Sequence, residues 1–337
     1  MTIAFRDFSW TPLHGSRRTL DGLDLRVEPG ERVLLVGPSG SGKSTALHAV
    51  AGALGATLVG EASGSVEVDG RIGMVTQNPS SSIVADRVGR DVAFGPENLG
   101  LPRDEIWRRV DAALESVGLP YDRERFTSAL SGGERHRLAL AGALATDPDV
   151  LLLDEPTSML DPALVEVVRD AVLAVVGDRS LVVVEHRFEP WLDHVDRVVV
   201  LDRGRLVFDG SVARFLTAAV PDALWMPGRP TPVPVEVPAE LLVPVEPARV
   251  RVSDLVVDQV TRGLRGSERT RAVSGLTLDL DPGTLTALLG PSGAGKSTAL
   301  LALGGLIDPV SGVVEAPPSL GWCPQDPELG FVATSVR

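Results

Sequence analysis

The chain contains the same nine-residue glycine-rich pattern twice. The first copy spans residues 37–45 (GPSGSGKST) and the second spans residues 290–298 (GPSGAGKST). Both match G-x-x-x-x-G-K-[ST], a loop whose backbone N–H groups can surround a phosphate at the start of a helix. The apolar run Val33–Val36 before the first copy predicts a buried strand that enters the loop. This pattern constrains the fold more than any other feature, because it requires a strand, a tight turn and a helix in that order.

The residue types of the two loops suit nucleotide phosphates and Mg²⁺. Glycines allow tight backbone turns, the lysine ammonium can reach the outer phosphates, and the serine hydroxyl after it can bind Mg²⁺. Lys43 is therefore a candidate catalytic residue, and Ser44 and Ser297 are candidate metal ligands. A glycine-rich turn that binds no nucleotide is the alternative. The predicted nucleotide contacts are Gly37, Pro38, Ser39, Gly40, Ser41, Gly42, Lys43, Ser44 and Thr45 in the first loop and Gly290, Pro291, Ser292, Gly293, Ala294, Gly295, Lys296, Ser297 and Thr298 in the second.

Lysine occurs only inside these two loops. Of the 32 basic residues, Lys43 and Lys296 are lysines and all the others are arginines. Two lysines placed at random among these positions would both fall in the motifs about once in 500 arrangements. A planar guanidinium cannot replace a compact ammonium inside a narrow ring of N–H groups. We infer that both lysines are chemically required.

The composition excludes several classes of protein. Forty-five acidic against 32 basic residues give a net charge of −13, which argues against a nucleic-acid-binding surface. The single cysteine, Cys323, excludes a disulfide within the chain and a cysteine-cluster metal site, and we interpret it as a buried or incidental thiol. The N-terminus does not resemble a signal peptide, and no apolar run approaches the ~18 residues that span a bilayer. We expect a cytosolic chain whose membrane role would depend on a partner.

Between the first loop and residue 150 the pattern changes from strands to helices. Residues 61–76 predict a hairpin-like section that ends just before Gln77, and residues 80–128 predict a charged helical insertion. Leu130–Glu134 (LSGGE) then opens a helix, with Ser131 and Glu134 at the spacing of a capping box. Capping explains these two residues but not the glycines between them, which cost about 1 kcal/mol each in a helix. Glycines there favour close approach of a large ligand to the helix N-terminus.

Two further apolar strands end in polar residues. Val150–Leu153 is followed by Asp154 and Glu155, and we expect this strand to lie beside the strand that enters the first loop, so that Asp154 holds Mg²⁺ and Glu155 acts on a water molecule. A solvated turn is the alternative for two adjacent acids. The next strand ends before His186, which can reach the γ-phosphate or can be structural. Trp10, in the early β-rich region, can stack on a nucleotide base or lie in a core.

A proline-rich connector separates the first loop's domain from the second loop. Residues 219–249 contain eight prolines, which favours an extended and semi-stiff linker. The earlier pattern then restarts, because Gly22 and Gly275 precede their loops by the same interval. We therefore predict a complete domain at residues 1–218, a linker at 219–249 and the N-terminal part of a second domain at 250–337.

The order of these motifs resembles the ATPase subunits of ABC transporters. This resemblance implies an α/β P-loop NTPase fold with a RecA-like core, an antiparallel β subdomain and a helical subdomain, followed by a partial second copy. It implies ATP and Mg²⁺ as cofactors, Glu155 as general base and His186 as the residue that contacts the γ-phosphate. Asp154 and Gln77 would support Mg²⁺, and Trp10 would stack on adenine. The remaining nucleotide contacts that it implies are Ser131, Gly132, Gly133 and Glu134, which would close over ATP bound to an opposing domain, Asp161 in the loop across the dimer interface, and Gln325, the counterpart of Gln77 in the second copy.

A finer resemblance comes from the segment that starts at Gln77 and continues through residues 91–102 (DVAFGPENLGLP). This segment is similar to the ATPases of energy-coupling-factor (ECF) importers, which take up vitamins, cobalt or nickel, and some of which fuse two ATPase domains. The resemblance implies an integral membrane coupling subunit, a substrate-binding membrane subunit and a second ATPase domain, from a homodimer or another chain. It places the protein at the cytoplasmic face of the cell membrane, with no nucleic-acid partner.

The sequence departs from the family pattern in two places. Glu134 stands where many members have glutamine. The second copy has no aromatic residue between Val250 and Gly275 and no LSGG segment, acidic strand end or switch histidine, so we expect that residues 250–337 cannot hydrolyse ATP. Two other readings stay open. One is a non-transport ABC ATPase that acts on DNA or ribosomes, and the other is an inactive truncated product.

Overall fold

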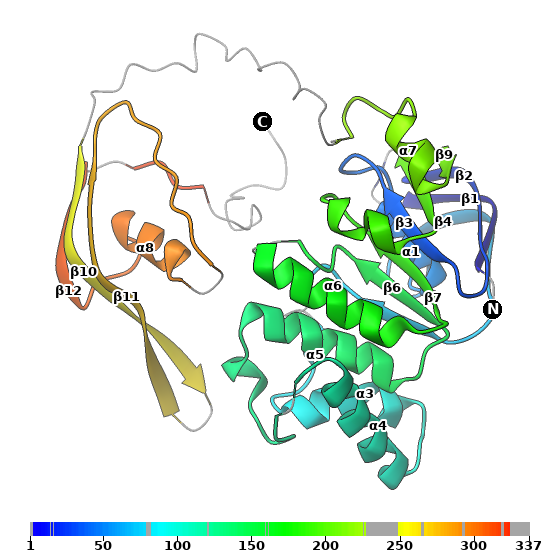
Figure 1. Cartoon of the computed structure of the whole chain (residues 1–337), viewed down its shortest axis with the longest axis horizontal. Helices are drawn as coiled ribbons and strands as arrows, with labels where there is room; N and C mark the ends of the chain where they lie inside the picture. Colours follow the sequence, from blue (N-terminus) through cyan, green and yellow to red (C-terminus); the bar gives the residue numbers. More distant parts are fainter. Residues whose placement is uncertain are drawn as a thin grey trace. The chain divides into compact units, whose positions relative to one another are not determined.

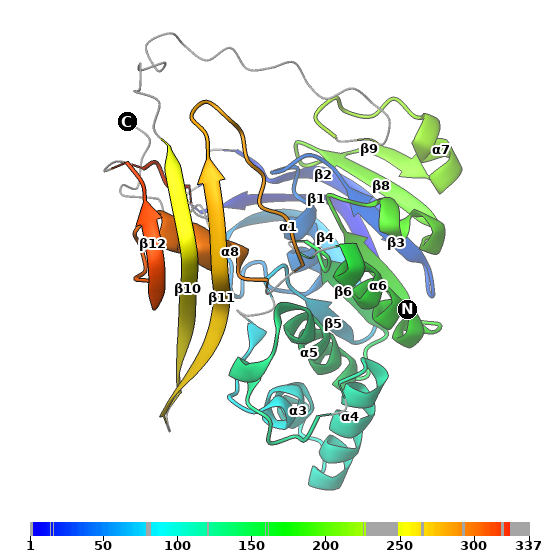
Figure 2. The same cartoon turned by 60° about the vertical axis from the view of Figure 1, so that its left-hand side comes forward.

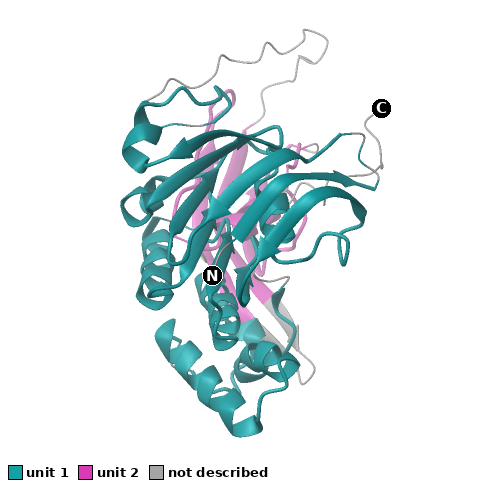
Figure 3. Cartoon of the chain, turned by 90° about the vertical axis from the view of Figure 1, so that its right-hand side faces the viewer, with its two compact units in different colours: residues 1–234 teal, residues 235–337 magenta. Residues whose placement is uncertain are grey.

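The computed structural model describes most of the chain, and the chain splits into two compact units, residues 1–234 and 235–337 (Figure 3). We describe each unit by itself. Four predicted contacts, Asp161, Ser292, Gly293 and Gln325, lie outside the described residues, so their roles stay predictions. The described residues are 3–13, 15, 17–78, 82–119, 121–158, 160, 162–224, 226, 249–263, 266–291, 294–317 and 320–323.

A six-stranded sheet forms the centre of unit 1 (Figure 1). Its strand order is β5-β6-β7-β3-β8-β9, and every neighbouring pair is parallel except β8 with β9. The inner strands are apolar at nearly every position because both faces of the sheet are covered. The strands are β3 (Arg32–Val36), β5 (Ile72–Val75), β6 (Val150–Asp154), β7 (Ser180–Val184), β8 (Arg197–Asp202) and β9 (Arg205–Gly210).

Two sequence-based expectations about strand pairing are wrong. The strand that ends in Asp154 does not lie beside β3, because β7 is inserted between β6 and β3. Residues 61–76 do not form a hairpin, because β4 (Gly60–Val68) pairs with β1 while β5 joins β6 in the central sheet. Both errors concern pairing between distant parts of the chain, which local residue patterns do not determine.

A smaller antiparallel sheet packs on one side of the central sheet. Its order is β2-β1-β4, with β1 at Ile3–Pro12 and β2 at Leu20–Val27. The buried side chains of these strands form one apolar cluster with helix α1 (Lys43–Val50) and the central sheet. This packing fixes the helix that follows the first glycine-rich loop.

Helices cover the other side and extend beyond it. The predicted helical insertion is confirmed by α3 (Val88–Asn98) and α4 (Arg103–Ser116), which pack with α5 (Gly132–Ala145). Together with the central sheet these helices form the larger apolar core. No helix in the described part of the chain is both long enough and apolar enough to cross a bilayer. The remaining helical elements of unit 1 are η1 (Thr127–Ala129), α6 (Pro162–Val176), η2 (Glu189–His194) and α7 (Val212–Thr217).

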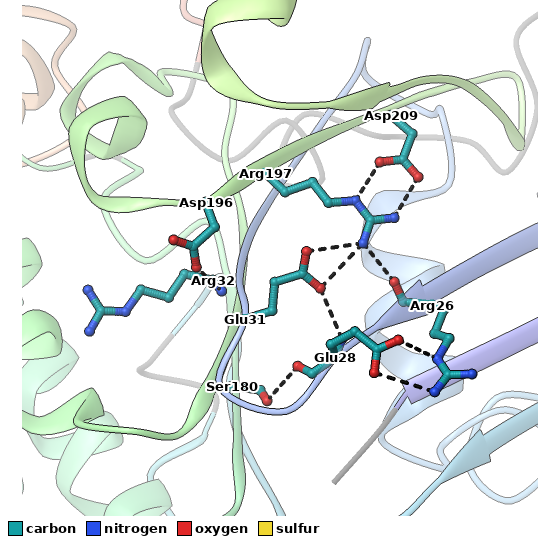
Figure 4. A network of polar contacts seen from close by, with 8 residues as sticks. All are labelled: Arg26, Glu28, Glu31, Arg32, Ser180, Asp196, Arg197 and Asp209. Carbon is teal, nitrogen blue, oxygen red and sulfur yellow. Dashed lines mark hydrogen bonds and ion pairs between the residues drawn. The ribbon is translucent and has the colours of Figure 1, made fainter.

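A polar network ties the turn between β2 and β3 to the edge of the central sheet (Figure 4). The Arg197 guanidinium donates to both carboxylate oxygens of Asp209, each at 2.5 Å, and to Glu31 at 3.1 Å. It also donates to the backbone carbonyl of Arg26 at 2.9 Å. These bonds raise the pKa of Arg197, with the hydrogen bonds to Asp209 as the largest cause and burial acting in the opposite direction. Because Arg197 begins β8, the network lies at the amino ends of the parallel strands.

Unit 2 contains an antiparallel sheet and a helix that follows the second glycine-rich loop. Its three strands have the order β11-β10-β12, and helix α8 (Lys296–Leu303) contacts β10 and β11 (Figure 2). The strands are β10 (Val250–Gly263), β11 (Gly266–Leu280) and β12 (Ser311–Glu315). The stretch before the second loop forms no strand, and Leu285 and Leu289 are 101% and 86% exposed. In unit 1 the corresponding strand, β3, lies between β7 and β8, and no counterpart of these two occurs among the described residues of unit 2.

Candidate nucleotide-binding site

The predicted site residues of unit 1 follow strands that point in the same direction. β3, β5, β6 and β7 are parallel, so their carboxyl ends meet at one edge of the sheet. The glycine-rich loop follows β3, Gln77 follows β5, Glu155 follows β6 and His186 follows β7. The topology therefore gathers four motifs that are far apart in the sequence.

The glycine-rich loop needs glycine just before helix α1. Gly42 has a φ of 102°, which side chains rarely tolerate, and a Cβ there would lie 2.6 Å from the carbonyl oxygen of Thr19. Helix α1 begins at the next residue, so its free N–H groups face the loop. The conformation leaves space and donors for an anion at the helix N-terminus.

Lys43 is held inside this loop. Its ammonium donates to the carbonyl oxygens of Gly37 at 2.9 Å and Pro38 at 3.0 Å, and the residue is 5% exposed. Burial lowers the pKa of Lys43, while the negative charges of Glu155 and Asp154 act against this shift. An ammonium has three N–H donors, so one remains for a phosphate oxygen.

Ser44 and Asp154 form a pair that suits Mg²⁺. The Ser44 hydroxyl donates to Asp154 Oδ1 at 3.1 Å, although the two residues come from α1 and β6. Burial raises the pKa of Asp154, and the hydrogen bond from Ser44 opposes this. A hydroxyl and a carboxylate supply the few hard oxygen ligands that Mg²⁺ takes from protein when phosphates and waters supply the rest. Ser41 Oγ is also buried and has no hydrogen-bond partner among the described residues, so a phosphate oxygen can satisfy it.

Glu155 lies between two other predicted residues. Gln77 Nε2 donates to Glu155 Oε2 at 2.9 Å, and His186 Nε2 lies 3.1 Å from Glu155 Oε1. The Glu155 backbone has a φ of 50°, an uncommon conformation outside glycine, and its N–H donates to Val184 O at 2.9 Å. The structure thus brings the predicted base, the loop glutamine and the switch histidine together.

A cavity opens beside this cluster. It has a volume of about 390 Å³ and is lined by His186, Arg187 and the start of the glycine-rich loop at residues 37–39, together with Ala223 and Leu224. The switch histidine and the first residues of the loop therefore face one space. This space is a candidate entrance to the phosphate end of the site.

The LSGGE segment folds as a capped helix start. Glu134 Oε2 accepts from the Ser131 backbone N–H at 2.7 Å, and Ser131 Oγ accepts from the Glu134 N–H at 3.4 Å. The Tyr121 hydroxyl donates to Glu134, which gives the unusual glutamate at this position a local partner. Gly132 is exposed, while a Cβ at Gly133 would lie 3.0 Å from Leu164. The role of residues 131–134 at an opposing nucleotide site stays a prediction.

Trp10, for which the family resemblance implies stacking on adenine, lies in an apolar core. The residue is 4% exposed and belongs to the apolar cluster under the antiparallel sheet. A Cβ at Gly60 would lie 2.5 Å from the indole ring, which shows how closely β4 covers it. A ring that stacks on a base needs a free face, and little of Trp10 is exposed in this structure; its stacking role stays a prediction.

The described residues of the second glycine-rich loop make the same lysine contacts as the first loop. Lys296 donates to the carbonyl oxygens of Gly290 at 2.8 Å and Pro291 at 2.7 Å, and Gly295 has a φ of 85° before helix α8. Gln259 donates to the hydroxyl of the buried Thr298 at 3.5 Å. No counterpart of Asp154 or Glu155 lies among the described residues of unit 2.

Sequence reasoning missed one buried pair beside the site. Glu185 is 2% exposed, and its carboxylate accepts hydrogen bonds from the backbone and the side chain of Thr157. The signal was present, because Glu185 directly follows the fully buried strand β7, where a charged residue needs partners.

Comparison with known proteins agrees with these motifs. The family model described as "ABC transporter" matches residues 20–158 and 273–330, which together make up more than half of the chain. An ABC transporter ATP-binding protein of Methanosarcina mazei is 31% identical over 93% of this chain and 62% of its own length. A relative with the same description from Streptomyces coelicolor is 34% identical over 93% of this chain and 66% of its own length. The chain thus spans about two thirds of the length of these relatives.

Solved structures show the same likeness. cbiO1 from Clostridium perfringens, described as part of the ABC transporter complex cbiONQ, has a TM-score of 0.56 and 28% identity, and the match covers 64% of this chain and 90% of that protein. A bacterial Atm1-family ABC exporter with ATP bound has a TM-score of 0.53 and 28% identity over 64% of this chain and 40% of its own. The motifs, the mixed α/β P-loop fold and these matches show that the chain belongs to the ABC transporter family of ATP-binding proteins.

Proposed function

We propose that this chain is an ATP-hydrolysing subunit that energises an ABC-type membrane transporter. The observation that carries this proposal is the position of Glu155, held between Gln77 and His186 at the sheet edge where Lys43 and the Ser44–Asp154 pair also lie. A base, a phosphate-binding cation and a pair of hard oxygen ligands at one edge are what phosphoryl transfer to water needs.

The reaction would be in-line attack of water on the γ-phosphorus of ATP. Glu155 accepts a proton from the attacking water or orients it, while Lys43 stabilises the charge that develops on the outer phosphates. Ser44 and Asp154 would hold Mg²⁺, with Gln77 in reach of the ion or its water, and the ion when bound neutralises phosphate charge. His186 keeps Glu155 in place through its 3.1 Å contact and would sense the γ-phosphate.

We infer that the transporter is an importer of the energy-coupling-factor type for a vitamin or a transition-metal ion. Support comes from the segment at residues 77–102 and from the likeness to cbiO1, itself described as part of a transporter complex. Under this proposal the chain binds the cytoplasmic face of the membrane through an integral coupling subunit, beside a substrate-binding membrane subunit. A second ATPase domain, from another copy or another chain, would supply the opposing LSGGE helix.

The domain boundaries belong to the same proposal. Residues 1–218 would form the working ATPase domain, 219–249 the linker and 250–337 the N-terminal part of a second domain. The division of the chain into two compact units near residue 234 supports a boundary inside the linker. Residues 250–337 would bind phosphates through the loop of Lys296 and would not hydrolyse ATP.

The base assignment can be tested with Glu155→Gln in the full chain. Glutamine keeps the size of the side chain but cannot accept a proton, so we expect kcat to fall at least about 100-fold while ATP still binds. Steady-state phosphate release and calorimetric ATP binding measure the two quantities. Glu166→Gln is the matched control, because Glu166 lies exposed on α6, and it should retain the wild-type rate. Turnover at the wild-type rate in Glu155→Gln would refute the assignment.

The transport assignment needs the membrane partners. Small membrane proteins encoded beside the gene would be purified with the chain and reconstituted in vesicles, with labelled cobalt, nickel and vitamins tested as substrates. We expect ATP-dependent uptake that is lost with Glu155→Gln. ATP hydrolysis without any association with such subunits would instead favour a non-transport ABC ATPase.

A further inference from the structure

A buried carboxyl group beside the site has no role in the reaction described above. Glu185 lies directly after β7 and directly before His186, and it is 2% exposed. An acidic side chain is almost never buried to this extent without partners that require it. The partners of Glu185 therefore indicate what it does.

The partner of Glu185 is Thr157, two residues after Glu155. Glu185 Oε1 accepts the Thr157 backbone N–H at 2.9 Å and the Thr157 hydroxyl at 2.5 Å. Thr157 is 6% exposed, so these bonds are shielded from water. Because the backbone N–H and the hydroxyl of Thr157 both donate to the same oxygen of Glu185, they define both the position and the orientation of Thr157.

Thr157 is in turn part of the loop that carries the base. The Ser158 N–H donates to the Glu155 carbonyl oxygen at 3.1 Å, which closes a turn around Thr157. The Leu160 N–H donates to the Thr157 carbonyl oxygen at 3.4 Å, so Thr157 also anchors the start of the following segment. Fixing Thr157 therefore fixes both ends of the loop.

The end of β7 holds this loop at three consecutive positions. Val184 O accepts from the Glu155 N–H at 2.9 Å, Glu185 accepts from Thr157, and His186 contacts the Glu155 carboxylate at 3.1 Å. Glu155 has a φ of 50°, an unfavourable conformation for a residue with a side chain, which persists only where surrounding contacts hold it. The Glu185–Thr157 bond is the middle contact, and both of its residues are buried.

The charge of Glu185 is unfavourable where it lies. Burial raises its pKa to about 7, with the hydrogen bonds from Thr157 acting in the opposite direction and the nearby negative charge of Glu155 adding to the rise. An apolar side chain would avoid this burial. A residue that lowers the stability of the fold and contacts the loop that carries the general base is a candidate for a functional role.

We propose that Glu185 is a positioning residue for Glu155, because its carboxylate fixes Thr157 and through it the loop that presents the general base. This inference rests on the proposed ATP hydrolysis. Glu185 does not touch the reacting atoms in this role. It keeps the Glu155 carboxylate in the arrangement with Gln77 and His186 that the structure shows.

Three variants of the full chain test the proposal. Glu185→Ala removes the acceptor, Thr157→Val removes the hydroxyl donor while keeping the shape, and Glu185→Gln keeps an acceptor oxygen without the charge. For each variant, kcat and KM for ATP are measured, together with ATP affinity by calorimetry and the melting temperature. Asp209→Ala is the matched control, because Asp209 is also a hydrogen-bonded carboxyl but lies with Arg197 at the opposite ends of the strands.

We expect the effects to appear in kcat and not in binding. Glu185→Ala should lower kcat about 30-fold, because small displacements of a catalytic group have effects of this order, with KM within about threefold of wild type. Glu185→Gln should recover at least about tenfold of that loss. Adding Thr157→Val to Glu185→Ala should lower kcat by less than about twofold more, because both changes break the same contact. Asp209→Ala should lower the melting temperature and leave kcat within about twofold.

Several outcomes would overturn the proposal. One is a Glu185→Ala protein that folds and hydrolyses ATP at the wild-type rate. Another is a loss of kcat in Glu185→Ala that Glu185→Gln does not recover, together with additive effects of Thr157→Val. If Glu185→Ala does not fold, Thr157→Val alone decides, and an unchanged kcat in that variant refutes the role. A wild-type chain that hydrolyses no ATP would instead refute the proposed function.

Discussion

The buried Glu185 predicts how the stability of this protein depends on pH. Burial raises its pKa in the folded protein to about 7, from an ordinary value of 4.5. Glu155 faces the same carboxyl group with a like charge, and Thr157 donates two hydrogen bonds to it. We predict that the wild-type protein loses stability as the pH rises through this range and that Glu185→Gln loses less.

The sign follows from proton binding. Between pH 4.5 and pH 7 the folded chain keeps a proton on Glu185 that the unfolded chain has already released, so raising the pH favours unfolding. Each pKa unit corresponds to about 1.4 kcal/mol, so the shift is worth on the order of 3 kcal/mol. This contribution is fully present below the unfolded pKa and is lost as the pH rises to about 7. Glutamine does not ionise and removes this contribution.

Urea unfolding of wild type and Glu185→Gln at pH 5 and pH 8 measures the effect. Tryptophan fluorescence reports mainly on unit 1, where Trp10, Trp107 and Trp191 lie, and the exposed Trp322 of unit 2 contributes equally in both proteins. Other shifted groups, such as Asp154, occur in both proteins, so their contributions cancel in the comparison. We expect the free energy of unfolding of Glu185→Gln relative to wild type to rise by about 2.5 kcal/mol from pH 5 to pH 8, because part of the contribution is already lost at pH 5. A difference that does not change with pH would refute the reasoning.

Three further predictions concern the phosphate loop, the core and the polar network. Lys43→Arg should lower ATP affinity at least about tenfold in calorimetry, because a guanidinium does not fit the ring of carbonyls and N–H groups that holds the ammonium. Wild-type ATP affinity in this variant would contradict the prediction. Trp10→Leu should lower the free energy of unfolding by about 2 kcal/mol, because the indole ring lies in the core. The same variant should change KM for ATP less than about twofold. A large rise in KM would support the stacking role. Arg197→Met should lower the free energy of unfolding by about 1 kcal/mol in urea titrations, because the half-buried Asp209 and Glu31 lose their shared partner. An unchanged midpoint would show that the network contributes little.

Local motifs allowed most of the site to be predicted. The conformation of the loop around Lys43 depends on glycines and on the helix start, and both are written in adjacent residues. Gln77, Glu155 and His186 were each recognised as residues at a strand end, and parallel strands bring such ends together without further information. The contact of Glu155 with both neighbours follows from this geometry.

The rest depended on distant parts of the chain. The insertion of β7 between β6 and β3 is a choice among strand orders that residue patterns do not distinguish. The burial pattern of β1 also depends on its partners: Asp7 has a φ of 45° beside a break in the register of this strand, so that Phe5 and Phe8 face the same core despite odd spacing. Alternation read from the sequence fails at such a bulge.

The two glycine-rich loops agree in the features that depend on nearby residues and differ in those that depend on distant residues. Gly37 and Gly290 are 253 positions apart, and both accept from the lysine of their own loop at nearly the same distance, 2.9 and 2.8 Å. The strand before the first loop is buried between β7 and β8, whereas the corresponding Leu285 and Leu289 are exposed. The lysine contacts within each loop therefore need only nearby residues, whereas a strand such as β3 needs neighbouring strands, β7 and β8, that come much later in the chain. Since Asp154 and Glu155 come from such a partner strand, the contact of Asp154 with Ser44 depends on pairing between distant parts of the chain, whereas the contacts of Lys43 do not.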